Sequence, residues 1–252
     1  VTNMGGSITE YDYALETGNA MKQLQLLPTF GDGASADKYR VGLHAIEQLG
    51  YGIPVFKPRT EQRELIRRIE SAARSGATAW GIDIDGVSFK TMVLKSAATS
   101  HKSLAELREL KIASTLPMVV KGVMTQADAA VAIEAGASAI VVSNHGGRVA
   151  DGMPGVARVL PQIARFVREQ APHVQVLADG GVRSGADIFR MLALGAEAVL
   201  VGRPVAIMAV GYGRTGVASM LRHWLDELRS IMQVHGVARL SDISAQHITK
   251  FI

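Results

Sequence analysis

The feature of this sequence that most constrains its fold is a repeated alternation of short apolar runs with longer amphipathic stretches. Each run is rich in Val and Ile, and the stretch after it has apolar residues three to four positions apart. This pattern predicts repeated strand–helix units with a parallel sheet. The predicted strands are Leu26–Phe30, Ile53–Phe56, Ala79–Ile84, Met118–Lys121, Ala139–Ser143, Val174–Ala178 and Ala198–Val201.

The stretches between these runs have the spacing of amphipathic helices. An eighth strand is predicted to end at Val1–Asn3, because the helix after it has Thr9 as its expected N-cap. The connection Val87–Lys102 contains no predicted element and is interpreted as an active-site loop. The predicted helices are Thr9–Gln25, Asp37–Leu49, Glu61–Ser75, Ser103–Ala113, Gln126–Ala135, Ala157–Gln170, Gly185–Leu194 and Gly216–His235.

Eight strand–helix pairs fit within 252 residues, a length typical of one (β/α)8 barrel. Barrel strands are buried on both faces and are therefore continuous in apolar residues, as Met118–Val120, Ile140–Val142 and Val199–Val201 are. A Gly-Ala pair also precedes three strands, where Gly can adopt the left-handed conformation that ends a helix. We predict the α/β class, as one (β/α)8 TIM barrel with a closed parallel sheet, in a single domain over residues 1–252.

Composition excludes several classes of protein. The apolar share of 48% and the charged share of 20% are those of a globular chain, and the net charge of +4 comes from Lys and Arg that are scattered among acidic residues. A small anionic partner fits this excess better than a nucleic acid does. No apolar run reaches the roughly 18 residues of a membrane span. The chain has no cysteine, so disulfides and thiolate nucleophiles are excluded. This absence is neutral about the compartment beyond not suggesting an oxidising one, and a cytoplasmic location is the default expectation.

Polar residues follow four consecutive strands at the point where each strand ends. In a barrel of this kind, the carboxyl ends of the strands carry the functional groups, and they share one mouth. We therefore expect these residues to lie together. The four segments are Lys121-Gly122, Ser143–Arg148, Asp179–Arg183 and Gly202-Arg203.

The last two of these segments predict a phosphate site. Gly180, Gly181 and Gly202 let backbone N–H groups approach a ligand closely, and each segment is followed by a helix whose N-terminus favours an anion. Arg183 and Arg203 add positive charge. The alternative interpretation is ordinary turn geometry, but two such turns on consecutive strands favour a bound phosphate.

Three further residues have the character of reactive groups. Lys121 ends an apolar strand, where a charge is costly unless it meets an anion or a ligand atom. His145 precedes Arg148 by three residues on a glycine-bearing turn, so an imidazole and a guanidinium can converge on one small anion. The Arg can hold a carboxylate while the His takes a proton from the adjacent hydroxyl. The other histidines lack metal-ligand spacing, and no metal is predicted.

Four motifs in order resemble the FMN-dependent α-hydroxy-acid oxidase/dehydrogenase family, which includes glycolate, lactate and mandelate enzymes. The resemblance runs continuously from about Thr115 to Ile248. The motifs are Val119–Val123, Val142–Arg148, Ala178–Asp187 and Val201–Pro204.

This resemblance implies an FMN cofactor and the oxidation of a small 2-hydroxy acid to a 2-keto acid. It implies that His145 is the catalytic base, that Arg148 binds the substrate carboxylate and that Asp179 supports the imidazolium. Lys121 and Ser143 are then expected beside the flavin, with Asp179 and Gly180 among the cofactor contacts. The FMN phosphate is expected to be held by Gly181, Arg183, Gly202 and Arg203. Family members often form tetramers, so a homo-oligomer is expected.

The first half departs from the family pattern. The stretch Gly52–Lys57 lacks the family's Gln and Tyr, and Asp83 occupies roughly the position of a family Thr. A carboxylate there disfavours flavin reduction unless a cation such as Lys57 or Lys90 pairs with it. The second family Arg that binds substrate is absent. The family's N-terminal helical arm is also expected to be absent, and the first residue is Val1.

Two other functions compete with hydroxy-acid oxidation. One is another FMN-barrel activity, of the type-2 isopentenyl diphosphate isomerase or glutamate synthase kind, for which Lys57, Arg59 and Lys90 could supply extra positive charge. The Asn144–Arg148 turn argues against it. The other is a barrel that binds flavin without turnover, which the missing Tyr and Arg of the first half favour.

Overall fold

The computed structural model describes residues 9–34, 36–87 and 89–248. Within them, seven strands form one parallel sheet in which each strand pairs with the next along the chain. This order confirms the predicted succession of strand–helix units. The strands are β1 Thr29–Gly31, β2 Ile53–Phe56, β3 Trp80–Asp83, β4 Met118–Val123, β5 Ala139–Val142, β6 Gln175–Ala178 and β7 Ala198–Val199.

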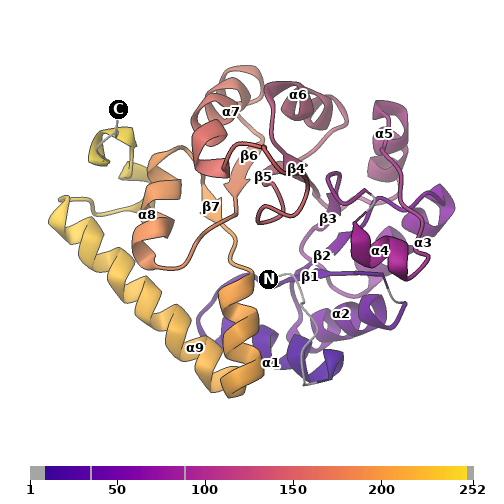
Figure 1. The fold of residues 1–252 in the computed structure, drawn as a ribbon, viewed down its shortest axis with the longest axis horizontal. Coiled ribbons are helices and arrows are strands. Elements are labelled where there is room, and N and C mark those ends of the chain that lie inside the picture. The colour runs from indigo at the N-terminus through magenta and orange to yellow at the C-terminus, as the bar shows by residue number, and fades with distance from the viewer. Residues whose placement is uncertain (1–8, 35, 88, 249–252) are drawn as a thin grey trace.

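Helices surround the strands, which occupy the middle of the molecule (Figure 1). They follow the strands in the order that the sequence predicts, and α1 packs on both α2 and α9. The helices are α1 Glu10–Gln23, α2 Ala36–Leu49, α3 Gln62–Arg74, α4 Lys90–Leu94, α5 Leu104–Ile112, α6 Gln126–Glu134, α7 Val156–Gln170, α8 Gly185–Ala193 and α9 Arg203–Val234, with short 3-10 turns at Leu240–Asp242 and Ala245–His247.

The sheet is curled, because side chains from non-neighbouring strands meet on its inner face. This inner cluster is separate from the larger core that packs between the sheet and the helices. Trp80, Ile82 and Ile140 belong to that outer core and are fully buried. Burial on both faces explains why the strands are continuous in apolar residues. The inner cluster consists of Ile53, Val55, Ala79, Val119, Ala139 and Val141, with Leu177 and Leu200 packed against it.

Local signals in the sequence have the predicted effect on the backbone. The side chain of Thr9 accepts a hydrogen bond from the N–H of Asp12 at 3.1 Å and caps α1. Gly76, Gly136 and Gly195 each follow a helix and have φ values of 81°, 88° and 110°. The left-handed conformation at these three helix ends is therefore confirmed.

The end of the sheet differs from the prediction. β7 has only two residues, and Val199–Val201 is half-buried rather than buried as predicted. Within the described residues, β1 and β7 are the two edges of the sheet, so the inner side of β7 is less covered. The predicted strand at Val1–Asn3 lies outside the described residues.

Two helix predictions were also incomplete. The last helix was predicted from Gly216, but α9 begins at Arg203 and is interrupted at Gly213, where φ is 56° and ψ is −152°. Within α9 only Gly213 leaves the helical conformation. The connection Val87–Lys102 contains the short helix α4. No helix in the described parts of the chain combines the length and apolar character needed to cross a bilayer.

Candidate active site at the strand ends

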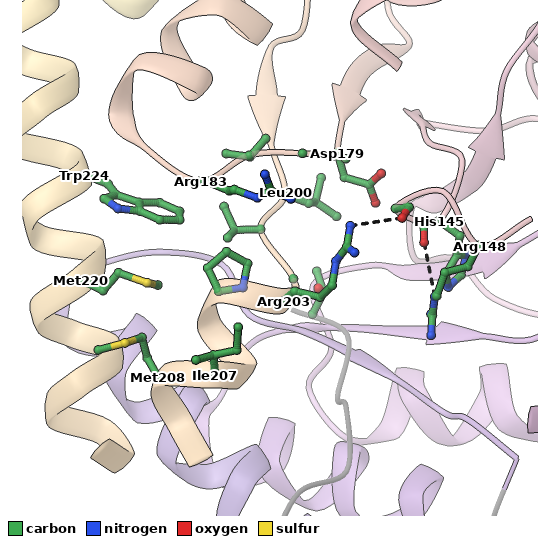
Figure 2. Close-up of a pocket in the computed structure, with 18 of the residues that line it drawn as sticks. His145, Arg148, Asp179, Arg183, Leu200, Arg203, Ile207, Met208, Met220 and Trp224 are labelled. Atoms are coloured by element: carbon green, nitrogen blue, oxygen red, sulfur yellow. Dashed lines mark hydrogen bonds between the residues drawn. The ribbon is translucent and has the colours of Figure 1, made fainter. Parts of the chain in front are cut away.

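A cavity of about 470 Å3 lies at the carboxyl ends of the strands, a volume within the usual range for small-molecule sites. Its lining includes Lys121, His145, Arg148 and Asp179. Figure 2 shows Arg203 reaching across this space toward the side of His145, while Trp224, Met208 and Met220 from α9 lie at the other side. The structure thus brings together most of the residues that the sequence predicted at one mouth.

Lys121 is held by three side chains. It is the register partner of Asp83 across β3 and β4, and its Nζ lies 3.1 Å from Asp83 Oδ1. Nζ also lies 3.4 Å from Asp179 Oδ2 and donates a hydrogen bond to Ser143 Oγ at 3.1 Å. Burial lowers the pKa of Lys121, but the carboxylates of Asp83 and Asp179 outweigh it and raise the pKa above its ordinary value. The side chain is therefore a buried ammonium.

Asp83 is shared by two ammonium groups. Lys57 Nζ lies 2.6 Å from Asp83 Oδ2, and Lys121 contacts the other oxygen. Burial raises the pKa of Asp83, but the two lysines together hold it below its ordinary range. The predicted cation beside Asp83 is confirmed, and it is Lys57. Lys90, the other predicted candidate, is exposed on α4.

His145 is a neutral base in this arrangement. Its φ of 56° is unusual for a non-glycine residue, and its backbone N–H donates to Ser143 Oγ at 3.1 Å. Nδ1 lies 3.0 Å from Asp85 Oδ1, and Nε2 lies 3.4 Å from Lys57 Nζ. A carboxylate at Nδ1 fixes the proton there and leaves the lone pair on Nε2. Burial lowers the pKa of His145, although Asp85 and Asp83 oppose the shift.

The carboxylate that supports His145 is Asp85, whereas the family resemblance assigned this role to Asp179. The carboxylate of Asp179 contacts Lys121 instead. Asp85 comes two residues after Asp83 and reaches the imidazole because Gly122 leaves room for it. A Cβ added at Gly122 would lie 2.6 Å from Asp85 Cγ. The signals that could have identified Asp85 are its place directly after the predicted strand Ala79–Ile84 and the glycine opposite it.

Arg148 lies beside His145, as predicted. Its Nε donates to the backbone oxygen of His145 at 3.4 Å (Figure 2). Its guanidinium lies 5.6 Å from the centre of the Phe89 ring. Phe89 meets the imidazole edge to face, with ring centres 4.6 Å apart. The guanidinium is exposed at the cavity, where it can bind an anion next to the base.

We call Gly180, Gly181, Arg183, Gly202 and Arg203 the phosphate cradle. Gly180 and Gly181 have φ values of 92° and 78°, and a Cβ added at Gly181 would meet nothing within 4 Å. Gly202 caps α9, so the N-terminus of α9 begins at the cavity. Arg203 Nη2 donates to the backbone oxygen of Gly146 at 3.1 Å, and both arginines line the cavity.

Asp179 tests whether these residues fit a ligand with hydroxyl groups and a phosphate. Its Oδ1 is buried and has no hydrogen-bond partner among residues 9–34, 36–87 and 89–248. A buried acceptor of this kind is costly unless a donor reaches it. A ligand hydroxyl would supply that donor, and the cradle beside it would supply charge for a phosphate. The residues therefore fit such a ligand.

We call Lys57, Asp83, Asp85, Lys121 and His145 the charged floor. Lys121 and His145 line the cavity, and the other three residues contact them from behind. Asp83, Asp85 and His145 place three atoms of metal-ligand type within 4.8 Å of one another. Two ammonium groups contact Asp83, however, and they would repel a cation. We therefore assign the cluster to charge pairing rather than to a metal.

Comparison with known proteins gives a consistent result. A model of the family described as FMN-dependent dehydrogenase matches residues 56–250. Glycolate oxidase 1 of Zea mays is 41% identical over 146 residues, which make up 58% of this chain and 39% of that protein. L-lactate oxidase of Roseobacter sp. (strain GAI101) is 44% identical over 146 residues, with the same shares. The chain thus spans about two fifths of the length of these relatives.

Solved structures with the same fold include two of mandelate oxidase. A single-substitution variant with 2-hydroxy-phenylacetamide has a TM-score of 0.75 and 28% identity, and the match covers 90% of this chain and 70% of that one. Mandelate oxidase with (S)-4-hydroxymandelic acid has a TM-score of 0.77 and 25% identity, and the match covers 94% and 76%. The likeness therefore extends over the divergent first half of the chain.

Proposed function

This chain belongs to the FMN-dependent dehydrogenase family, and from that premise we propose that it binds FMN and oxidises a small 2-hydroxy acid to a 2-keto acid. One observation carries the proposal. A neutral buried imidazole, His145, has its lone pair on Nε2 and lies beside an exposed guanidinium, Arg148, at one cavity. A proton acceptor next to a carboxylate binder is what the oxidation of a 2-hydroxy acid requires.

The residues that hold FMN in this proposal are those of the phosphate cradle together with Lys121, Ser143 and Asp179. The cradle binds the phosphate, and the unpartnered Oδ1 of Asp179 accepts a hydrogen bond from a hydroxyl of the cofactor. When bound, FMN supplies the redox chemistry by accepting two electrons from the substrate. The ammonium of Lys121 then favours the negatively charged, reduced form of the ring.

The substrate in this proposal is anchored by its carboxylate. Arg148 binds that carboxylate, and His145 Nε2 takes the proton of the adjacent hydroxyl group. Asp85 stabilises the resulting imidazolium through Nδ1, at 3.0 Å. Phe89, edge to face with the imidazole, excludes water from one side of the base.

The same proposal includes a closed eight-stranded barrel in one domain, a homo-oligomer and a cytoplasmic location. The curled parallel sheet with an apolar inner cluster supports closure. The family resemblance supports the oligomer, and the cytoplasmic location is the default expectation. Sedimentation of the purified protein and fractionation of cells test the last two points.

The diphosphate isomerase alternative loses support from the ion pairs. Its extra cations were predicted to be Lys57, Arg59 and Lys90, of which Lys90 is exposed. Lys57 contacts Asp83, while Arg59 Nη2 donates to the backbone oxygen of Gly33 at 2.8 Å and lies 3.6 Å from Asp32. Lys57 and Arg59 therefore have partners inside the protein and are not available to bind a diphosphate.

An anaerobic absorbance spectrum tests the proposed function. The protein, loaded with FMN, is titrated with lactate, glycolate and mandelate. We expect the yellow flavin bands to bleach, and we expect His145→Ala to slow bleaching by roughly 10²–10⁴-fold, as the loss of a general base does. A protein that holds FMN but is bleached by none of these acids would support the non-catalytic alternative. A protein that does not hold FMN would refute the proposal.

A further inference from the structure

Lys57 is a buried ammonium that the proposed reaction has not used. It lies two residues after Val55, which belongs to the inner cluster, and so faces the same side of the sheet. Its backbone N–H donates to Asp32 Oδ1 at 2.9 Å. Gly86 leaves room for its stem, since a Cβ added there would lie 2.9 Å from Lys57 Cδ. The position of Lys57 is therefore fixed by its neighbours.

The ammonium of Lys57 faces the base as well as its counter-ion. Nζ lies 2.6 Å from Asp83 Oδ2, 3.4 Å from His145 Nε2 and 5.0 Å from the centre of the Phe89 ring. Lys121 already contacts the other oxygen of Asp83. Asp83 thus has a cation without Lys57, and a role as counter-ion alone does not explain a second ammonium at the base nitrogen.

A hydroxyl group that reaches Nε2 also comes within reach of Lys57. The lone pair of His145 is on Nε2, because Nδ1 faces Asp85. A hydroxyl oxygen must lie about 3 Å from Nε2 to give up its proton. An ammonium has three N–H donors, so Lys57 can donate to that oxygen while it keeps its contact with Asp83.

We propose that Lys57 is a further catalytic residue, which donates a hydrogen bond to the hydroxyl oxygen of the bound 2-hydroxy acid; this rests on the proposed function. The O–H bond breaks and its proton goes to His145 Nε2. The electron pair left on oxygen forms the C=O bond, while the C–H hydrogen leaves with its electron pair for the flavin oxidant. The ammonium stabilises the negative charge on oxygen and is not consumed.

Single-turnover flavin reduction of the FMN-loaded Lys57→Met variant tests this role. We expect reduction at saturating hydroxy acid to be roughly 10²–10³-fold slower, as after the removal of one oxyanion donor, with unchanged FMN affinity. Lys95→Met, which removes an exposed lysine just after α4, is the matched control and should reduce as fast as the unmodified protein. Unchanged reduction in Lys57→Met would refute the proposal.

A double variant separates a donor from a counter-ion. Lys57→Met/Asp83→Asn removes both charges of the pair. If Lys57 only balances Asp83, the double variant recovers the rate; if Lys57 donates to the substrate, it stays slow. We also expect added ethylamine to restore part of the rate of Lys57→Ala. Recovery in the double variant, or no rescue by the amine, would contradict the donor role.

A titration of the FMN-free protein gives a readout that is independent of turnover. Removing the cation of Lys57 should raise the pKa of His145, so both the NMR titration of this imidazole and the acid limb of the rate profile should move to higher pH. An unmoved His145 titration would contradict the contact. If the unmodified protein holds FMN but no hydroxy acid reduces it, the proposed function fails as well. The charged groups that face this imidazole are Asp85, Asp83, Lys57 and Lys121, while Arg148 contacts the backbone oxygen of His145.

Discussion

The charged floor and the phosphate cradle meet at one cavity, which Lys121 and His145 of the floor line directly, but they are built in opposite ways. In the floor, Asp83 is 1% exposed and Lys121 3%, and each charge has a partner within the protein. In the cradle, Arg183 and Arg203 are exposed and open glycine backbone faces the cavity. The charges of the floor are paired within the protein, whereas the cradle is open to the ligand that we propose. Changes in the floor should therefore affect stability and chemistry, and changes in the cradle should affect cofactor binding.

The largest effect on stability is expected for Asp83→Asn. It leaves the ammonium groups of Lys57 and Lys121 without their shared carboxylate, and removing one partner of a buried ion pair costs about 3–5 kcal/mol. Urea unfolding of the FMN-free protein measures this loss. The control is Asp226→Asn, which removes one partner of an exposed ion pair with Arg229 and should cost at most about 1 kcal/mol. Equal losses in the two variants would remove the distinction between floor and surface.

A pH-dependent loss of stability is expected from Asp32, which fixes the backbone of Lys57. Burial raises the pKa of Asp32 to about 6, despite Arg59 and Arg68. The folded protein then binds more protons than the unfolded chain between about pH 4 and pH 6, so this carboxyl contributes less stability as the pH rises through that window. The loss amounts to up to about 3 kcal/mol.

The free energy of unfolding, compared with that of Asp32→Asn, isolates this contribution. Between pH 4 and pH 6, the free energy of unfolding of the unmodified protein should fall relative to that of Asp32→Asn. Above pH 6, the difference between the two free energies should be constant. Asp226→Asn should show no such trend. A difference that grows with pH would mean that Arg68, 2.6 Å from Asp32, dominates over burial.

The smallest effect of the three concerns the cradle. Arg203→Met should weaken FMN binding by roughly 10–100-fold, the value of one hydrogen bond to a charged group, and should leave stability within about 0.5 kcal/mol because the side chain is exposed. Fluorescence titration with FMN measures the affinity. Arg165→Met, an exposed change on α7, is the control. A large loss of stability in Arg203→Met would show that the cradle is also built before the ligand arrives.

The sequence predicted the cradle and much of the floor, for reasons that are physical. Strand periodicity identifies where each strand ends, so Lys121, His145 and Arg148 were expected at one mouth, and the structure brings them together. Strand periodicity does not predict whether Asp85 or Asp179 contacts His145. Asp85 approaches His145 because Gly122, on the neighbouring strand, has no side chain. That is a packing relation between residues far apart in sequence.

The fold, like the site, was predicted only in part. Strand order and the glycine-ended helices follow from local patterns, and both were confirmed. The extent of α9 was not predicted, because a glycine-rich stretch is compatible with either a helix or a loop. Packing against α1 and α8 stabilises the helix in this segment. Tertiary contacts, rather than helix propensity, therefore determine where α9 begins.

The pairing of Asp83 with Lys121 across β3 and β4 also bears on how the chain finds its fold. A slip of one residue between these strands would turn Lys121 toward the helices and leave Asp83 facing apolar side chains on the inner side. A buried charge without its partner is far costlier than a misplaced Val, so the charges penalise wrong registers more strongly than the apolar pattern does. Asp83 and Lys121, which belong to the candidate active site, therefore also favour the correct alignment of β3 with β4 during folding.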